Sequence, residues 1–376
     1  MKKIKILQVG LSYKAGGIES FLMSYQSNMD LKKIKMDFIN VFDEAVNEEF
    51  YSKLNQKGKM YNLSNYRKYP IKFLKELKKI QESEKYDIFH YNMNSACYLF
   101  PLIAAKIAGF KNIIAHSHNS SSDKGIIKNI IHNINKIFIP LFANKYFACS
   151  QTAGRWFFSK KILNSENFFI INNAIDTKKY KFNDKIRKEK RKSLKISDET
   201  VVIGHVGRFK KQKNHEFLIE IFETYSKKYK KCILLLVGFG PLEGHIKEIV
   251  RNKKIENSVI FLGERNDVEE LMQAMDVFIL PSLYEGLPIV GIEAQISGLP
   301  CIFSDTITDE LKITESAKFV SLHDSSQVWA ENIKQIVKNN KQRIDINSDD
   351  FDIKINAKRL EKIYEEIIFN QNGGKM

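Results

Sequence analysis

The chain has 376 residues, of which 43% are hydrophobic and 28% are charged, which is typical of a water-soluble globular protein that is too long for one core. Its four widely spaced cysteines predict buried free thiols in a reducing compartment, and they exclude a disulfide framework or a cysteine zinc site. No run approaches about 18 apolar residues, and the apolar stretch in MKKIKILQVG is too short for a secretory signal, so we expect a cytoplasmic protein without a membrane span.

The net charge of +16 is concentrated in the first half of the chain. Residues 1–200 carry 36 Lys and Arg against 18 Asp and Glu, whereas residues 201–376 carry 24 against 26. Within the basic half, residues 65–81 read NYRKYPIKFLKELKKIQ, which predicts a Lys-rich amphipathic helix. Such a helix suits an anionic membrane surface or nucleic acid phosphates, although a solvated surface helix explains the same pattern.

Strand-like and helix-like segments alternate along the first 175 residues. The strand-like segments are short apolar runs at residues 3–10, 35–41, 86–92, 112–119, 145–150 and 167–175. Helical segments lie between them, for example at 95–109 and 125–142. Such alternation predicts a parallel sheet with helices on both faces.

A charged segment at residues 176–200 has little apolar periodicity, and we interpret it as a linker. Alternation then restarts, with strand-like runs at 201–209, 232–240, 258–264, 277–282, 300–305 and 318–322, and the chain closes with a helix at about 354–369. The prediction is therefore an α/β fold of two doubly wound, Rossmann-like domains that face each other across a cleft. The predicted boundaries are 1–178 for the first domain, 179–199 for the linker and 200–355 for the second domain, with 356–376 packing back on the first.

Two carboxylates stand eight positions apart in PSLYEGLPIVGIEAQISGLP, residues 281–300. Glu285 follows a strand-like run, at the edge where open α/β sheets bind ligands. Glu293 lies about two turns into the helix that follows Pro288, at a position that the apolar pattern would give to the core. Because a buried carboxylate is costly without a partner, Glu293 either binds a polar ligand or is satisfied by a neighbouring Lys or the backbone.

Basic residues and glycines follow other strand-like runs. Arg208 and Lys213 lie in HVGRFKKQKNHEF before the next helix, which suits a diphosphate but also describes a solvated basic loop. Gly238 in LVGFGPLEGHI indicates either backbone close to a ligand or a turn. After the first strand, Gly16 and Gly17 open a turn in which backbone N–H groups could face an anion.

His116 and His118 end the strand-like run 112–119. Because they alternate, we expect them to point to opposite faces of the sheet, so that one faces the cleft. No carboxylate lies nearby in the sequence, so the pair makes a poor metal site. A packed, hydrogen-bonded histidine explains at least one of them.

In this order along the chain, the motifs resemble those of the retaining glycosyltransferases of family 4, which have the two-Rossmann-domain architecture called GT-B. The motifs are AGGIE, HSHN, NNAID, GRF with Lys213 and Asn214, GFGP, and the Glu-x7-Glu of Glu285 and Glu293. They span nearly the whole chain, and HSHN and QKNHEFLIEIF look most like the bacterial members that build capsular or exopolysaccharide repeat units. The resemblance implies a hexosyltransferase that uses a nucleotide-diphosphate sugar, with a UDP-sugar favoured.

The resemblance also implies site residues. Glu293 would accept hydrogen bonds from the ribose hydroxyls, and Glu285 and His118 would act at the transferred sugar as the catalytic residues. The residues implied in holding the nucleotide diphosphate are Gly16, Gly17, Arg208, Lys213, Gly238, Gly286, Leu287, Pro288 and Ile289. Because two cations serve the diphosphate, we expect no metal and no other cofactor. No nucleophile is identifiable, so a front-face mechanism is favoured over a double displacement.

By the same resemblance, the first domain takes the acceptor, which is a glycan or a polyprenyl-diphosphate-linked sugar. The basic first half then suits peripheral docking on the inner face of the cell membrane, with residues 65–81 as the expected contact and 184–195 as the next. We expect no nucleic acid partner, because interleaved aromatic and basic motifs are absent.

Two other hypotheses share this architecture. A non-hydrolysing nucleotide-sugar epimerase should carry acid–base carboxylates in its first domain, where this chain has histidines. A non-catalytic partner protein would not need the complete set of Arg208, Lys213, Glu285 and Glu293.

Overall fold

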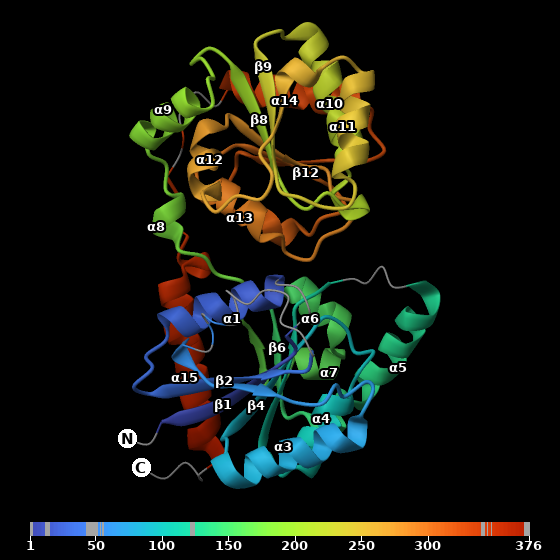
Figure 1. Cartoon of the computed structure of the whole chain (residues 1–376), viewed down its shortest axis with the longest axis vertical. Helices are drawn as coiled ribbons and strands as arrows, with labels where there is room; N and C mark the ends of the chain where they lie inside the picture. Colours follow the sequence, from blue (N-terminus) through green and yellow to red (C-terminus); the bar gives the residue numbers. More distant parts are fainter. Residues whose placement is uncertain are drawn as a thin grey trace. The chain divides into compact units, whose positions relative to one another are not determined.

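The computed structural model describes residues 3–11, 16–42, 52, 54, 56–120, 125–339, 343, 345–346 and 348–371. The chain divides into two compact units (Figure 1). The first unit is Met1–Ile175 together with Asp349–Met376, and the second unit is Asp176–Ser348.

A seven-stranded parallel sheet of order β3-β2-β1-β4-β5-β6-β7 forms the centre of the first unit. Its strands are β1 (Ile4–Val9), β2 (Ile34–Asn40), β3 (Met60–Asn62), β4 (Ile88–Met93), β5 (Asn112–Ser117), β6 (Lys145–Ala148) and β7 (Phe168–Ile170). Every strand predicted in this half is present. The additional edge strand β3 has only three residues, MYN, which is too short for a recognisable apolar run.

Helices cover both faces of this sheet because alternate residues of each strand point to opposite sides. The helices are α1 (Gly17–Asn28), α3 (Pro70–Glu84), α4 (Phe100–Ile107), α5 (Gly125–Phe142), α6 (Gln151–Phe157), α7 (Lys160–Leu163) and α15 (Ile353–Gln371). Leu7 of β1 packs with α3, α4 and α6, whereas the neighbouring Ile6 packs with α1 and α15. The C-terminal helix α15 therefore completes the first unit, which confirms the predicted return of the chain.

The second unit repeats the architecture with a six-stranded parallel sheet of order β10-β9-β8-β11-β12-β13. The strands are β8 (Val201–Val206), β9 (Cys232–Val237), β10 (Val259–Phe261), β11 (Val277–Leu280), β12 (Cys301–Ser304) and β13 (Ala317–Val320). The helices are α8 (Thr177–Tyr180), α9 (Asp184–Ser193), α10 (His215–Lys228), α11 (Glu243–Asn252), α12 (Val268–Ala274), α13 (Ile289–Ile296) and α14 (Ser326–Asn339). Short 3-10 helices are η1 (Lys211–Lys213), η2 (Glu256–Ser258) and η3 (Asp309–Leu311) in this unit and η4 (Asp349–Phe351) in the first.

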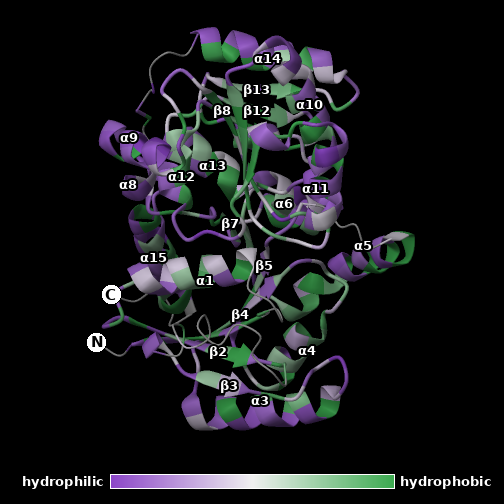
Figure 2. Cartoon of the chain, turned by 45° about the horizontal axis from the view of Figure 1, so that its top comes forward, coloured by the Kyte–Doolittle hydropathy of each residue, from purple (hydrophilic) through white to green (hydrophobic). Residues whose placement is uncertain are grey.

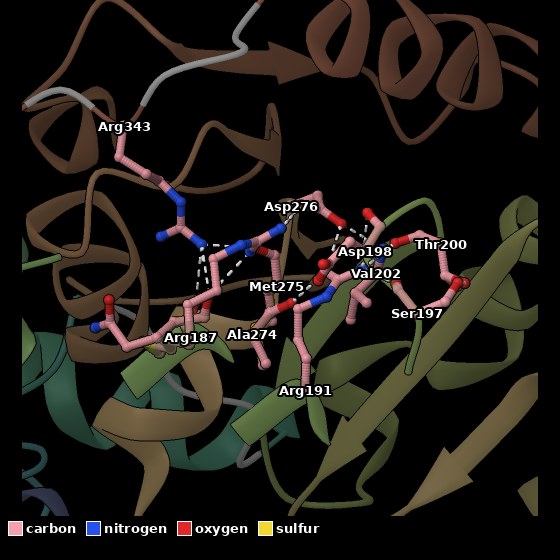
Figure 3. Close-up of polar contacts among 12 residues, drawn as sticks. Arg187, Arg191, Ser197, Asp198, Thr200, Val202, Ala274, Met275, Asp276 and Arg343 are labelled. Atoms are coloured by element: carbon pink, nitrogen blue, oxygen red, sulfur yellow. Dashed lines mark hydrogen bonds and ion pairs between the residues drawn. The ribbon is translucent and has the colours of Figure 1, made fainter. Parts of the chain in front are cut away.

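The segment expected to be a linker is a folded part of the second unit. Residues 176–200 form α8 and α9, and Arg191 of α9 is 1% exposed. Its guanidinium donates to Asp276 Oδ2 at 3.2 Å and to the backbone carbonyl of Ala274 at 3.0 Å (Figure 3). Arg187 donates to Asp276 Oδ1 at 2.6 Å. The segment lacks apolar periodicity because its buried anchor is an arginine, paired with a carboxylate and carbonyl groups.

A pocket of about 580 Å³ opens beside this arginine cluster, at the amino ends of β8 and β11. It is lined by Arg187, Asp276 and Arg343, among others. Arg343 donates to carbonyls at the end of α12, including that of Met275 at 2.5 Å, and burial lowers the pKa of Arg343 to about 9. Arg187, Asp276 and Arg343 thus already hydrogen-bond to other groups of the second unit. The pocket lies at the amino ends of the strands, whereas Glu285 follows the carboxyl end of β11.

The cysteines are free thiols. Cys149, Cys232 and Cys301 are buried, whereas Cys97 is half-buried. Among the described residues, none of the helices has both the length and the apolar character needed to cross a membrane.

Candidate active site

Both sheets have a switch point, where the chain reverses the direction in which it adds strands. In the second unit this point lies between β8 and β11, which are neighbours in the sheet although two strands separate them in sequence. Loops that leave such neighbouring strands diverge and form a crevice at their carboxyl ends. Arg208 and Lys213 follow β8, and Glu285 follows β11. These three predicted donor-site residues therefore come from the two loops that border this crevice.

Lys213 and Glu285 form an enclosed ion pair. Lys213 Nζ lies 2.6 Å from Glu285 Oε1, and the two side chains are only 13% and 9% exposed. Gln212 Nε2 donates to Glu285 Oε2 at 3.2 Å and to the carbonyl of Tyr284 at 3.0 Å, while Gln212 O accepts from Leu283 N–H at 2.8 Å. The carboxylate orientation is thus fixed by groups on the loop after β8.

Glu285 lies immediately before the amino end of α13. Leu287 is buried, and Pro288 is the N-cap of the helix. Pro288 has no N–H and presets the backbone for the first turn instead of donating to a ligand. The N–H groups at the start of this helix, which begins at Ile289, carry the positive end of its dipole, and that of Gly291 donates to the Pro288 carbonyl oxygen at 3.0 Å. This helix end and Lys213 together provide positive electrostatic potential beside one enclosed carboxylate.

Arg208 and Gly238 occupy the loops after β8 and β9. Arg208 is exposed, and its guanidinium lies 6.0 Å from the ring centroid of Phe239. Gly238 has φ of +131°, and a Cβ there would lie 2.2 Å from the carbonyl oxygen of Gly207. Gly238 is therefore required by the close approach of two loop backbones.

Glu293 faces a tyrosine that the sequence did not suggest. Tyr180 donates its hydroxyl to Glu293 Oε1 at 2.8 Å across 113 residues of sequence. Burial raises the pKa of Glu293 to about 7, the tyrosine hydrogen bond opposes this rise, and the charge of Glu269 adds to it. Tyr180 is itself held in place, because Gln273 Nε2 donates to its carbonyl oxygen at 3.2 Å. Glu293 is thus a half-buried carboxylate with a neutral hydroxyl partner, rather than one paired with a Lys.

His116 and His118 lie on the same side of the sheet in the first unit. Their ring centroids are 4.0 Å apart, so the expected alternation to opposite faces is wrong. Residues two positions apart in an extended segment point to the same face, so the spacing of His116 and His118 places both rings on one side, although β5 itself ends at Ser117. His116 is fully buried, whereas His118 keeps partial exposure. Of the two, His118 is the one that a substrate can reach.

A network of amides fixes the protonation state of His118. Asn92 Nδ2 donates to Gln8 Oε1 at 2.9 Å, so Asn92 Oδ1 is the acceptor for His118 Nε2, also at 2.9 Å. His118 therefore carries its proton on Nε2, and its Nδ1 has the lone pair. Burial lowers the pKa of His118 to about 3, so the ring is neutral at physiological pH. It can accept a hydrogen bond from a hydroxyl but is not a cation.

The glycine pair before α1 is arranged differently from the expected anion site. Gly16 is the N-cap of α1, and its N–H donates to Glu19 Oε2 at 2.7 Å. A Cβ on Gly17 would meet nothing within 4 Å. The acidic Glu19 side chain, which is buried, thus already occupies one of the donors that the predicted phosphate contact would use.

Comparison with known proteins identifies the family. Residues 186–349 match the family described as glycosyl transferases group 1. The putative glycosyltransferase EpsF of Bacillus subtilis is 32% identical over 338 residues, which cover 88% of this chain and 86% of EpsF. The chain belongs to the glycosyl transferases group 1 family.

Other relatives agree with this assignment. The UDP-Gal:alpha-D-GlcNAc-diphosphoundecaprenol alpha-1,3-galactosyltransferase of Escherichia coli is 28% identical over 242 residues, 62% of each chain. Further relatives carry names from capsular and Vi polysaccharide biosynthesis. The crystal structure of Anabaena Alr3699/HepE in complex with UDP superimposes with a TM-score of 0.74 at 21% identity, covering 98% of each chain. This glycosyltransferase therefore has the GT-B fold of two Rossmann-like domains, and its homologues act in polysaccharide biosynthesis.

The first unit of this glycosyltransferase has a pocket of about 330 Å³ at its own switch point, at the carboxyl ends of β1 and β4. Aromatic and amide side chains line it, among them Tyr66, Tyr98 and Asn92, together with Arg67. The guanidinium of Arg67 lies 4.1 Å from the ring centroid of Tyr98. Planar rings, amides and a cation in one pocket suit a polyhydroxylated ligand with flat apolar faces.

In each unit, several residues of the candidate site have no signal in the sequence. Tyr180 lies in the segment predicted to be a linker, and Gln212 lies beside a motif residue but has no motif of its own. Tyr66 and Arg67 fall in the predicted surface helix, and Tyr98 falls in a predicted helix without a role. Their roles depend on contacts between distant segments, for which one sequence carries no local signal.

Proposed function

We propose that this glycosyltransferase transfers a sugar from a UDP-sugar to a glycan or a lipid-linked saccharide, with retention at the anomeric carbon, as a member of family 4. The observation that carries the proposal is the enclosed Lys213–Glu285 pair at the amino end of α13. It combines a cation, helix N–H groups and a carboxylate, which are the groups that a sugar diphosphate requires.

The second unit binds the donor in this proposal. Lys213, Arg208 and the first N–H groups of α13 neutralise the diphosphate, and Glu293 accepts hydrogen bonds from the ribose hydroxyls. Glu285 accepts from hydroxyls of the transferred sugar. The UDP bound in the Anabaena structure, and the UDP-Gal in the name of the Escherichia coli relative, support uridine as the base.

The chemical step needs charge stabilisation more than a nucleophile. As the bond between the anomeric carbon and the phosphate oxygen breaks, negative charge grows on the diphosphate, where Lys213, Arg208 and the helix end stabilise it. The acceptor hydroxyl attacks from the same face, and its proton passes to the departing phosphate oxygen. Because protein cations supply the stabilisation, the step requires no divalent metal.

The first unit binds the acceptor. Its pocket of about 330 Å³ offers the rings of Tyr66 and Tyr98 for stacking on a sugar. His118 Nδ1 accepts a hydrogen bond from a substrate hydroxyl, since the neighbouring Asn92 keeps the proton on Nε2. The diphosphoundecaprenol acceptor in the name of the Escherichia coli relative supports a lipid-linked saccharide as the substrate class.

A thermal-shift panel of UDP-, GDP- and ADP-sugars tests the donor, because a ligand that binds only the folded state raises the melting temperature. UDP-sugars should stabilise the protein in EDTA as well as in buffer with magnesium. Stabilisation that disappears in EDTA would contradict the proposed phosphate site. Nuclear magnetic resonance of the product from an α-linked donor should show an α linkage, and a β linkage would exclude the retaining assignment.

A further inference from the structure

Helix α5 presents its apolar side to the solvent, the reverse of an ordinary surface helix. Eight large apolar side chains of α5 are exposed, with exposed fractions from 39% for Ile131 to 80% for Ile126. They are Ile126, Ile127, Ile130, Ile131, Ile134, Ile137, Phe138 and Leu141. Figure 2 shows this helix projecting at the side of the first unit, with hydrophobic stretches in green beside hydrophilic ones in purple. We call these eight residues the α5 face.

The α5 face is continuous. At about 100° per residue, its eight side chains fall within an arc of roughly 140°, and no charged or amide side chain of the helix falls inside that arc. His132 and Ile139, the buried residues of α5, lie on the opposite side. The exposed apolar area therefore forms one stripe along the helix and is not a scatter of single residues.

Polar residues hold the helix in this orientation. His132 Nδ1 accepts from the Ala96 N–H at 3.0 Å, and its Nε2 lies 3.3 Å from the Trp156 carbonyl oxygen. The His132 and Trp156 rings are stacked, with their centroids 4.0 Å apart. Asn135 Nδ2 donates to the Ala96 carbonyl at 2.9 Å. Rotating α5 to bury the stripe would break these hydrogen bonds and leave buried polar groups unpaired. The outward apolar face is thus built into the fold.

The surrounding charge indicates what covers the α5 face. Residues 101–165 contain nine Lys and Arg and a single acidic residue, Asp123. A second copy of the chain, paired symmetrically through α5, would bring two such cationic regions together and incur repulsion. A lipid layer with anionic headgroups offers hydrocarbon to the stripe and negative charge to the cations around it.

We propose that α5 is a membrane anchor that lies in the plane of an anionic lipid surface with the α5 face inserted among the acyl chains. The helix has 18 residues, so it is about 27 Å long, and such helices insert about 5–10 Å deep. Lys128 and Lys136 lie outside the arc, where their ammonium groups stay at headgroup level. This anchor is distinct from the Lys-rich helix α3, whose Phe73 and Leu77 point into the core and whose contribution to lipid binding is electrostatic.

Liposome co-sedimentation of the full chain tests the proposal. Wild-type protein should bind vesicles of phosphatidylglycerol and phosphatidylcholine, and part of the binding should persist in about 1 M NaCl because apolar insertion is not screened. The triple variant Ile127→Gln, Ile130→Gln, Ile134→Gln should lose more than about tenfold in lipid affinity. Gln favours helix more than Ile, and all three sites are exposed, so folding should be preserved.

Two control variants test whether lipid binding depends on α5 rather than on α15 or α3. The double variant Ile355→Gln, Phe369→Gln removes exposed apolar side chains from α15 and should leave lipid binding unchanged. Replacement of the exposed Lys72, Lys75, Lys78 and Lys79 of α3 by Gln should lower binding mainly at low salt. Brominated acyl chains should quench the tryptophan fluorescence of an Ile134→Trp variant more strongly than that of the wild type.

Three results would overturn the anchor. They are unchanged lipid binding by the triple Gln variant, absence of wild-type binding to anionic vesicles, and a wild-type dimer that the triple variant converts to monomer, which would assign the α5 face to a second copy. The donor site does not enter this test. A UDP-sugar thermal shift that is equal in wild type and triple variant keeps a failure of the anchor separate from a failure of the proposed transfer chemistry.

Discussion

At the scale of single residues, Glu285 and Glu293 are each contacted by a side chain from a distant part of the chain, Gln212 and Tyr180 respectively. Glu285 and Glu293 were recognisable because each stands at a fixed offset from a strand end or a helix start. Their partners Gln212 and Tyr180 come from 73 and 113 residues away in the chain. No local pattern marks such a partner, since the pairing exists only once strands and helices have assembled.

The raised pKa of Glu293 predicts how stability depends on pH. The unfolded chain releases this proton near the ordinary value of 4.5, whereas the folded protein holds it until about pH 7. Ionisation of Glu293 therefore costs folded-state stability as the pH rises from 4.5, and the full cost applies above 7. Glu293→Gln should be more stable than wild type by about 1–3 kcal/mol at about pH 8 and equal to it at about pH 4, as measured by urea unfolding. If the free energies of unfolding of the two proteins differed by the same amount at both pH values, the raised pKa of Glu293 would be contradicted.

Substitutions of the two carboxylates should affect different measurements, UDP affinity for Glu293 and sugar transfer for Glu285. Glu293→Ala should weaken binding of UDP by about 2–4 kcal/mol, because a contact to ribose exists with or without the sugar. Glu285→Gln should leave UDP affinity within about threefold, because its proposed partners are sugar hydroxyls, and should lower transfer at least about a hundredfold. Calorimetry with UDP and an assay of transfer measure the two effects. Equal losses of UDP binding in both variants would contradict the proposed roles.

At the scale of elements, sequence periodicity found the strands and most helices, but it missed α9 and gave no indication of which side of α5 is buried. Helix α9 looked like a linker because its buried residue is Arg191, and a rule that equates burial with apolar residues does not detect it. Helix α5 was correctly bounded, yet its apolar stripe faces solvent. In both helices, specific hydrogen bonds decide which side is buried. Arg191 donates to backbone carbonyls, whereas in α5 His132 accepts from the Ala96 N–H and Asn135 donates to the Ala96 carbonyl.

Arg191 should be a large contributor to the stability of the second unit. It donates to the carbonyls of Ala274, Ser197 and Thr200 and to Asp276. Arg191→Met should cost about 3–5 kcal/mol, because buried acceptors lose their donor. Lys188→Met on the same helix is the matched control, since its pair with Asp184 is exposed and its loss should leave the free energy of unfolding nearly unchanged. Chemical denaturation of both variants measures this difference, and similar losses would refute the structural role of Arg191.

At the scale of the whole molecule, the second unit is an insertion in the first. The chain leaves the first unit after Ile175 and returns at Asp349, and the two crossings lie side by side. Ile175 N–H donates to Phe351 O, and Ile353 N–H donates to Ile175 O, both at 2.9 Å. The predicted return of residues 356–376 to the first domain is confirmed by this division of the chain. The exact crossing depends on these backbone hydrogen bonds, which no side-chain pattern encodes.

Because each unit has a core of its own, a single substitution in α15 should weaken the first unit and spare the second. Tyr364 of α15 is fully buried, and its hydroxyl lies 2.8 Å from Nδ1 of His90 in β4. Tyr364→Ala should destabilise the first unit by about 3–5 kcal/mol through the cavity and the lost hydrogen bond to His90. Ile355→Ala, on the exposed side of the same helix, should cost less than about 0.5 kcal/mol. In scanning calorimetry, Tyr364→Ala should shift one transition downward, while UDP still raises the transition of the second unit by the wild-type amount. If the substitution lowered both transitions equally, or abolished the shift caused by UDP, the two units would not be independently stable.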